Sequence, residues 1–465
     1  MPLTLAIPGG DLGAFALVGG AALLMLGLAE LVRKAGGSAE LSRKTAHVGS
    51  GVLAATFPWV FESPWTVTAM AVVFLLVMVV SRRMRLLDGV HGVDRDSLGA
   101  QAFPVVIATL FWLTLDQPLL YAIPILVLAV SDAVAALIGK SYGTVHYRAL
   151  GERRSFEGSF AFFVATFLVV HIPLLMWGVT TRVDSLLIAA SVAVLVTCLE
   201  AISIRGLDNL FVPVGTWYAL NNYLNASSAQ DQQDRLVFFA GAAVVTIGLR
   251  RAGHLTRTAA VGVFLCAYAA WSMGGWEWLT PLLGGWLLVL GLSILARRQK
   301  PDSAPMGLSH LFQVSVTSVA IVFVWDLTAD AAVYPAYLAG VTGATAVVAG
   351  GLARRLDASV PSALALSVLL PTVCALPWGP PVPSATVVMA AGLMGLAAPG
   401  LVRALGPSAA RFTCVTCATS TSEPRHCHTP ATLSRGRRWW TLARAAWLSI
   451  VAAAVLGLLV RLATR

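Results

Sequence analysis

The chain has 465 residues, of which 57% are hydrophobic and only 12% are charged, and its mean hydropathy is +0.79. This composition excludes an ordinary soluble domain and indicates a polytopic membrane protein. The formal net charge is +10. Basic residues collect on the cytoplasmic side of membrane proteins, so we expect no nucleic-acid partner. No basic segment precedes the first apolar run, and we expect no cleavable signal peptide.

Apolar runs long enough to cross a membrane occur along most of the chain. We expect about 14 to 16 spans, and hence an all-α fold, a polytopic transmembrane helical bundle. The runs are 12–32, 46–61, 65–81, 100–116, 119–138, 158–178, 185–203, 207–223, 235–249, 258–274, 276–296, 309–327, 331–353, 360–378, 382–402 and 445–461. A polar stretch near 225–257 predicts two tandem bundles, 1–234 and 235–465, the second with a polar loop at 408–438.

Basic residues follow alternate spans. The clusters are Arg33/Lys34/Arg43/Lys44, Arg82/Arg83/Arg85, Lys140 to Arg154, Arg205, Arg250/Arg251/Arg257, Arg297/Arg298/Lys300, Arg354/Arg355 and Arg403 to Arg444. The intervening loops carry almost no basic residues. The alternation predicts an outside N-terminus and cytoplasmic basic loops. We therefore expect an integral multi-pass membrane protein, in the plasma membrane if the source is prokaryotic, with its polar motifs facing the cytoplasm.

Asp132 carries a carboxylate inside the apolar run IPILVLAVSDAVAALIG. An ionised carboxylate at membrane depth costs about 2.5–3.5 kcal/mol on insertion scales, so it is rarely retained for packing alone. Two interpretations remain open. The side chain can be bonded to a neighbouring helix, or it can be a functional carboxylate that holds Mg²⁺.

A loop rich in glycine and positive charge follows Asp132, and Glu157 opens the next helix. Glycines let backbone N–H groups approach phosphate, and cations neutralise its charge. The glycines are Gly139, Gly143 and Gly158, and the cations include Lys140, Arg148, Arg153 and Arg154. This combination predicts a nucleoside-triphosphate site. Glu157 itself fits a helix cap as well as it fits a catalytic or metal-binding role.

Arg43, Lys44 and His47 lie where a cytoplasmic loop enters a span. They fit positive-inside anchoring with a histidine at a helix end. They also fit a phosphate clamp, because His47 lies one helical turn from Arg43 on the same face. Both interpretations remain open at this point.

Glu200, Asp208 and Asn209 form an acidic and polar set at the cytoplasmic end of a span. An Asp-Asn pair at the start of an apolar segment can be a helix N-cap. It can also complete an Mg²⁺ shell, because hard cations prefer carboxylate and amide oxygens. We favour the metal interpretation because Asp132 is expected at the same depth.

A cysteine and histidine cluster lies in the polar loop at 408–438. Its candidate ligands are Cys414, Cys417, His426 and Cys427, whose spacing is typical of a structural zinc site. Disulfides are disfavoured in a cytoplasmic loop. A loop without metal is the competing interpretation.

Four motifs of the first half, in this order, resemble the phytol kinase/dolichol kinase family of membrane prenol kinases. They are RKTAH (43–47), DAVAALIGKSYG (132–143), RRSFEGS (153–159) and LEAISIRGLDNLFVP (199–213). The resemblance covers roughly residues 30–225. It implies transfer of the γ-phosphoryl group of CTP, or of another nucleotide, to the hydroxyl of an isoprenoid alcohol such as phytol or a polyprenol. The family's glycine-loop signature falls on Asp132, Gly139, Gly143, Glu157 and Gly158.

Two positions depart from the dolichol kinase pattern. The usual Lys-Trp after the second glycine is His146-Tyr147 here, and the usual Lys-Lys before the glutamate is Arg153-Arg154. Most of the charge is retained, and the nucleotide preference is left open.

The second half resembles a separate membrane family that includes phytyl-phosphate kinases. The similar segments are 255–278, 310–325 and 414–440. The acidic signature expected in the middle is replaced by GVTGATAVVAGG (340–351), which contains no acid. Without acids there is no evident Mg²⁺ site, so we expect a catalytically inactive or altered second half.

These observations together predict a prenol kinase. We expect Mg²⁺ held by Asp132, Asp208 and Asn209, with Glu157 or Glu200 positioning or deprotonating the alcohol. The cations and glycines named above would contact the nucleotide. The bilayer, the alcohol and the nucleotide are the expected partners. The alternatives are a phosphatidate cytidylyltransferase, whose distal motif RGLDN would match poorly, and a transporter, whose acids would lie nearer the midplane.

Overall fold

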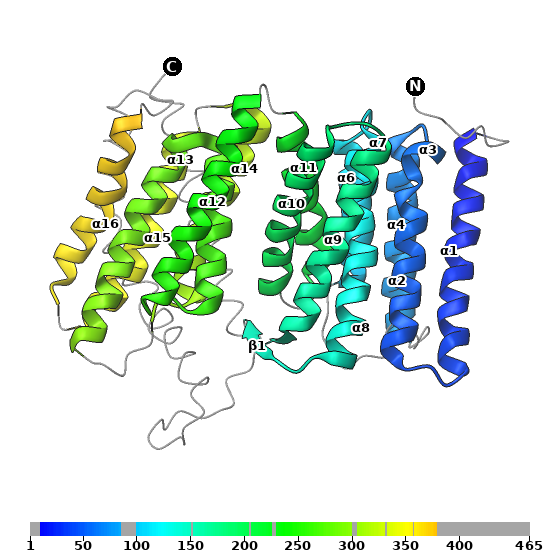
Figure 1. The fold of residues 1–465 in the computed structure, drawn as a ribbon, viewed down its shortest axis with the longest axis horizontal. Helices are drawn as coiled ribbons and strands as arrows, with labels where there is room; N and C mark the ends of the chain where they lie inside the picture. The colour runs from blue at the N-terminus through cyan, green and yellow to red at the C-terminus, as the bar shows by residue number, and fades with distance from the viewer. Residues whose placement is uncertain are drawn as a thin grey trace. The chain divides into compact units, whose positions relative to one another are not determined.

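The structure is a computed structural model that describes residues 10–84, 99–149, 152–203, 206–225, 229–299, 305–330, 333–356 and 358–378. These residues are helical apart from turns, short connections and one two-stranded hairpin, so the predicted all-α transmembrane bundle is confirmed (Figure 1). By length and composition, eight helices of these ranges can cross a membrane. The predicted spans at 382–402 and 445–461 and the loop at 408–438 lie outside the described residues.

The chain divides into two compact units, unit 1 (Met1–Leu236) and unit 2 (Val237–Arg465). Unit 1 contains α1 (Gly10–Lys34), α2 (Ala39–Ala55), α3 (Phe57–Val60), α4 (Pro64–Arg83), α6 (Gly99–Leu113), α7 (Pro118–Leu126), η1 (Val127–Ser131), α8 (Asp132–Tyr142), β1 (His146–Ala149), β2 (Glu152–Ser155), α9 (Phe156–Met176), α10 (Arg182–Ile202) and α11 (Asp208–Leu224). Unit 2 contains α13 (Arg257–Gln299), α14 (Leu308–Thr328), α15 (Tyr334–Arg355), α16 (Val360–Ala375) and η3 (Leu376–Trp378). Helix α12 (Ala229–Arg251) begins in unit 1 and continues into unit 2.

One span of unit 1 is built from α7, the π-helical turn η1 and α8 in direct succession. Leu128 and Ala129 of η1 are fully buried. Helix α2 crosses η1 so closely that a Cβ atom on Gly51 would overlap the Cβ of Ala129. This close crossing brings the first half of α2 beside the residue that follows the π turn. Wide π turns are frequently found at functional sites.

A β-hairpin, which the sequence analysis does not foresee, joins α8 to α9. Strands β1 and β2 pair antiparallel, from His146 opposite Ser155 to Ala149 opposite Glu152. Ser155 then caps α9, because its Oγ accepts a hydrogen bond of 3.1 Å from Gly158 N. The cap satisfies one of the free N–H groups of the first helical turn and fixes where the hairpin ends.

In unit 2, α13 is 43 residues long but reverses direction at Gly275, whose backbone is not helical (φ 72°, ψ −161°). A straight helix of that length would span about 65 Å. Instead, Arg297 near its end donates a hydrogen bond to the carbonyl of Gly253, just before its start. Two antiparallel segments result, as the separate spans at 258–274 and 276–296 predict. Helix α15 is the most buried of the candidate spans.

Candidate active site

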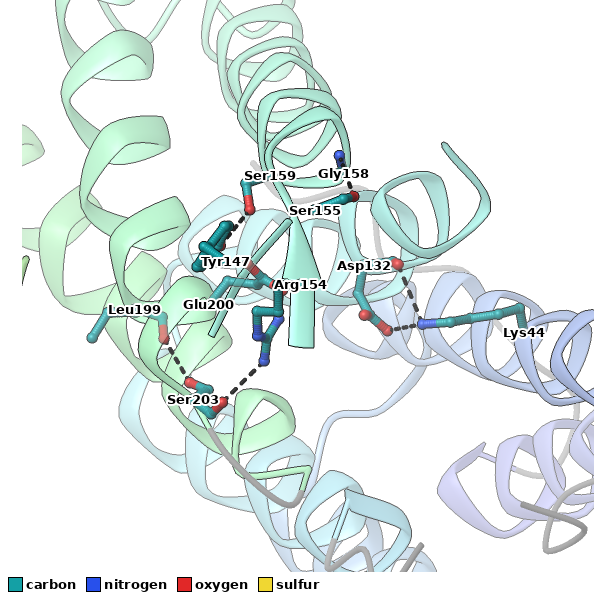
Figure 2. Close-up of polar contacts among 10 residues, drawn as sticks. All are labelled: Lys44, Asp132, Tyr147, Arg154, Ser155, Gly158, Ser159, Leu199, Glu200 and Ser203. Atoms are coloured by element: carbon teal, nitrogen blue, oxygen red, sulfur yellow. Dashed lines mark hydrogen bonds and ion pairs between the residues drawn. The ribbon is translucent and has the colours of Figure 1, made fainter. Parts of the chain in front are cut away.

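Lys44 of α2, which is buried, and Asp132 at the start of α8, which is partly buried, form an ion pair, although 88 residues separate them in sequence (Figure 2). Lys44 Nζ also lies 3.2 Å from the carbonyl oxygen of Asp132. Only 4% of the Lys44 side chain is exposed. A buried ammonium group is retained at reasonable free energy only when it is paired and hydrogen-bonded, so this contact fixes both side chains.

His47 lies one turn further along α2, on the same face as Lys44. Its Nε2 atom is 3.6 Å from Asp132 Oδ2 and 3.3 Å from the carbonyl oxygen of Leu128 in the π turn. Its ring packs against Phe103 of α6. The charge of Arg43 acts on both Asp132 and His47. The structure therefore places the three basic residues of the RKTAH motif, Arg43, Lys44 and His47, near Asp132.

Arg154 on β2 makes a second ion pair, with Glu200 near the end of α10 (Figure 2). Its Nη2 atom donates a 3.0 Å hydrogen bond to the carbonyl oxygen of Ser203, the residue that ends α10. A cation at a helix C-terminus interacts favourably with the helix dipole. Glu200 is 9% exposed at its side chain, so the hairpin carries Arg154 to a buried carboxylate.

Asp208 connects the two ion pairs. It lies in the first turn of α11 and within electrostatic range of Asp132, Arg154 and Lys44. The N-cap position is taken by Leu207, so the structure gives Asp208 no capping role. Its Oδ1 atom is buried and has no hydrogen-bond partner within the described part of the chain. A buried carboxylate oxygen without a partner is unfavourable unless a ligand satisfies it.

Gly139, Gly143 and Gly158 pack α8 against α9 and the hairpin. A Cβ atom on Gly139 would lie 2.8 Å from Ser155 Oγ, and one on Gly158 would lie 3.0 Å from the carbonyl oxygen of Ala135. A Cβ on Gly143 would lie 2.8 Å from Ser155 Cβ. The structure thus shows a packing reason for the glycine spacing. Their contribution to nucleotide binding stays a prediction.

Glu157 holds the beginning of the hairpin. Its Oε1 atom accepts hydrogen bonds from the hydroxyl of Thr144 and, at 3.0 Å, from Val145 N. The hydroxyls of Tyr147 and Ser159 meet at 2.7 Å on the same connection. Oε1 of Glu157 therefore ties the start of α9 to the segment before β1. Lys140 and Arg153, which the sequence also predicts to bind nucleotide, are exposed.

Across the described ranges, no group of three or more His, Cys, Asp and Glu side chains is placed to hold a metal ion. Asp132 and Asp208 provide two carboxylates, with Asn209 next to the second. The predicted zinc ligands Cys414, Cys417, His426 and Cys427 lie outside the described residues.

Comparison with known proteins identifies a relative of this chain. Over 182 residues the chain is 36% identical to a protein of Synechocystis sp. named "Phytol kinase", a match that covers 38% of this chain and 77% of that protein. The chain belongs to the phytol kinase family. No family model matches the sequence, and no solved structure matches it.

The phytol kinase family resemblance of the four sequence motifs agrees with this relationship. The structure brings together these site residues: Arg43, Lys44, His47, Asp132, Arg154, Glu200 and Asp208. Sequence reasoning missed the carbonyl of Ser203 and the Tyr147–Ser159 contact. A signal for the hairpin was present, because Leu150 and Gly151 separate its two strands, and two-residue loops with glycine are typical of hairpins.

Proposed function

We propose that this protein is a membrane kinase that transfers the γ-phosphoryl group of a nucleoside triphosphate to the hydroxyl of an isoprenoid alcohol. CTP is the donor that the family resemblance implies. The observation that carries the proposal is the convergence of three carboxylates from α8, α10 and α11 on two cations, the buried Lys44 and the partly buried Arg154. The name of the Synechocystis relative supports an isoprenoid alcohol as acceptor.

The donor set fits Mg²⁺. This ion is usually held by one or two protein carboxylates, with water and substrate phosphates completing the shell, so a group of three acids is not required. The unpartnered Oδ1 of Asp208 offers an open ligand position. Asp132, Asp208 and the adjacent Asn209 would hold the ion, and it would supply positive charge to neutralise the phosphates of a nucleotide.

The two cations fit the remaining charge of a triphosphate. Lys44 and Arg154 now contact carboxylates, and each can turn to a phosphoryl oxygen at little cost because the charge of the partner is similar. Fixed cations of this kind stabilise the charge that spreads over the transferred phosphoryl group. His47 and Arg43 support the same region from α2.

Glu200 is the base that this arrangement favours. Oε1 of Glu157 accepts two hydrogen bonds that hold the segment before β1, whereas Glu200 is freed when Arg154 turns to phosphate. The hydroxyl oxygen of the alcohol attacks the γ-phosphorus, and its proton passes to the Glu200 carboxylate. The bond from the γ-phosphorus to the β–γ bridging oxygen breaks, and the nucleoside diphosphate leaves.

In this proposal the site faces the cytoplasm, because basic residues mark the cytoplasmic side of a membrane protein. The end of α1 that carries Arg33 and Lys34 lies at the same end of unit 1 as the hairpin in Figure 1. The test uses a protein whose native cysteines are replaced. A cysteine at Ser141 should react only with reagents on the cytoplasmic side, and a cysteine at Ser228 only from outside. The reverse labelling pattern would place the site on the outer side, away from soluble nucleotide, and would refute the kinase proposal.

Purified protein incubated with CTP and a panel of prenols tests the activity. Label from γ-labelled CTP should appear in the lipid, while label from α-labelled CTP should stay in the soluble nucleotide. The opposite distribution would identify a cytidylyltransferase, and no labelled lipid with any prenol or nucleotide would refute the kinase. Parallel reactions with labelled ATP and UTP identify which nucleotide is the phosphoryl donor. Asp184→Asn, at the other end of α10 from Glu200, is the matched control for Asp132→Asn.

A further inference from the structure

A tight junction between α12 and α13 closes one end of unit 2. Gly253 has a left-handed backbone (φ +76°) just beyond α12. Gly253 N donates to the carbonyl of Arg250 and His254 N to that of Leu249, both at 3.0 Å. This is the Schellman pattern of helix termination, in which glycine follows the helix because it adopts a positive φ without strain. Arg250 and His254 therefore lie at one sharp turn.

The segment before α14 fastens this junction. Met306 N donates to the carbonyl of His254, and Thr256 N donates to the carbonyl of Met306, both at 3.1 Å. Leu255 and Met306 are buried. The guanidinium group of Arg297 folds back onto the junction and donates to the carbonyl of Gly253. Three basic side chains from three segments thus share one anchored turn.

Each of these three side chains has a buried nitrogen without a partner. Within the described residues, Arg250 Nε, His254 Nδ1 and Arg297 Nε make no hydrogen bond. A buried polar group left unsatisfied is unfavourable, so each of these nitrogens would be stabilised by a ligand that brings acceptor oxygens to the junction. Phosphate oxygens match such a set of donors, because charge-assisted hydrogen bonds from arginine to phosphate are strong.

No described acid of unit 2 lies at this end. The three acids in that part of the chain are Glu277, Asp326 and Asp330. Glu277 follows the reversal of α13 at Gly275, and Asp326 is 18 residues beyond Leu308 in α14, about 27 Å along the helix. A carboxylate of the described unit therefore does not neutralise the cluster, and an external anion can.

The surroundings indicate which anion. Ile247 lies one turn before Arg250 and Val244 one turn before Ile247, and their exposed fractions are 52% and 69%. This apolar strip of α12 leads directly to the cationic cluster. A free phosphate would use only the cluster, whereas a phospholipid would use both the cluster and the strip. Basic pockets between helices at a membrane surface are known to recognise anionic headgroups.

We propose that Arg250, His254 and Arg297 bind the headgroup phosphate of an anionic phospholipid, whose acyl chain lies along the Val244–Ile247 strip of α12. The site belongs to unit 2 and is independent of the kinase function proposed for unit 1. It would fasten the α12–α13 junction to the leaflet that adjoins the basic ends of the helices.

Native mass spectrometry of the full-length protein in detergent measures the affinity for the first bound lipid. Dioleoyl phosphatidylglycerol should bind more tightly than dioleoyl phosphatidylcholine. Arg250→Gln and Arg297→Gln should each weaken phosphatidylglycerol binding about fivefold, the loss that corresponds to about 1 kcal/mol for one basic residue at the surface. Arg298→Gln removes the same charge from the exposed neighbour of Arg297 and should leave the affinity unchanged.

Three results would overturn the proposal. Equal loss on Arg298→Gln would mean a diffuse surface charge instead of a built site. Equal binding of the two lipids would mean that the headgroup is not recognised. Displacement of phosphatidylglycerol by millimolar inorganic phosphate would identify a soluble anion as the ligand. Arg297→Lys distinguishes misfolding from lost binding, because it keeps the charge and should retain most of the affinity.

Discussion

Units 1 and 2 are membrane bundles of similar size that differ in what they bury. The described core of unit 1 contains Lys44 and Glu200 among its buried polar side chains, and Asp132, His47 and Arg154 lie beside them. In the described core of unit 2, every buried polar side chain that is not aromatic is Ser or Thr. Hydroxyl groups can bond to a carbonyl of their own helix, whereas buried charges need specific partners.

This difference between the units indicates where in the molecule a catalytic site is expected. Charges at membrane depth are unfavourable and are retained where a function uses them. The central helix of unit 2, α15, shows the alternative, with Thr342 bonded to the carbonyl of Leu338 in its own helix. Phosphoryl transfer uses fixed cations beside carboxylates, and among the described residues such groups lie together only in unit 1.

The largest effect is expected for Asp132→Asn. Asn keeps the size of the side chain but removes the charge that holds Lys44 and would bind Mg²⁺, so phosphoryl transfer should fall by at least about 100-fold, as when one preorganised electrostatic group is lost. Transfer of γ-label to prenol measures it. Asp184→Asn should keep full activity. Near-normal turnover of the correctly folded Asp132→Asn variant would refute the assignment of the catalytic site to the charged residues of unit 1.

Glu200→Gln and Glu157→Gln should separate two glutamates that sequence alone leaves equivalent. Glu200→Gln removes the proposed base and leaves the Arg154 charge unpaired, so we expect a loss of about 10²-fold in kcat, within the range for general bases. Glu157→Gln keeps an acceptor for Thr144 and Val145, so weakening one charged hydrogen bond should lower activity only about fivefold. If Glu157→Gln is the more damaging, the base has been misassigned.

Glycine substitutions test packing in the two units. Gly139→Ala places a Cβ 2.8 Å from Ser155 Oγ and should lower the free energy of unfolding by about 1–3 kcal/mol, as overpacking does. Gly351→Ala in α15 meets no atom within 4 Å and should stabilise its helix by up to about 1 kcal/mol. Thermal unfolding of both variants measures the difference. Equal effects would show that the α8–α9 packing is not tight.

The sequence predicts the helical membrane fold and most of the residues that converge in the site, because hydropathy and isolated charges are local signals. It does not predict the partners. Lys44 meets Asp132 across 88 residues only because α2 crosses the π turn at Gly51. The hairpin that carries Arg154 to Glu200 has strands of only four residues, so the alternation of apolar and polar residues that would predict a strand is weak. Glycines suggest phosphate contact, but the observed contacts are with a neighbouring helix.

The smallest effect on the chemistry is expected when unit 2 is removed. A protein ending after Arg251 keeps α12 whole and retains every member of the proposed site. Its turnover per folded molecule should equal that of the full chain, although loss of apolar surface contacts can lower the amount of protein that inserts. Size-exclusion chromatography and product analysis distinguish these outcomes.

Both proteins should convert prenol to monophosphate and form little diphosphate from added prenyl monophosphate, because the described core of unit 2 buries no acid. Robust diphosphate formation by the full chain, lost on truncation, would show that unit 2 is itself an active kinase.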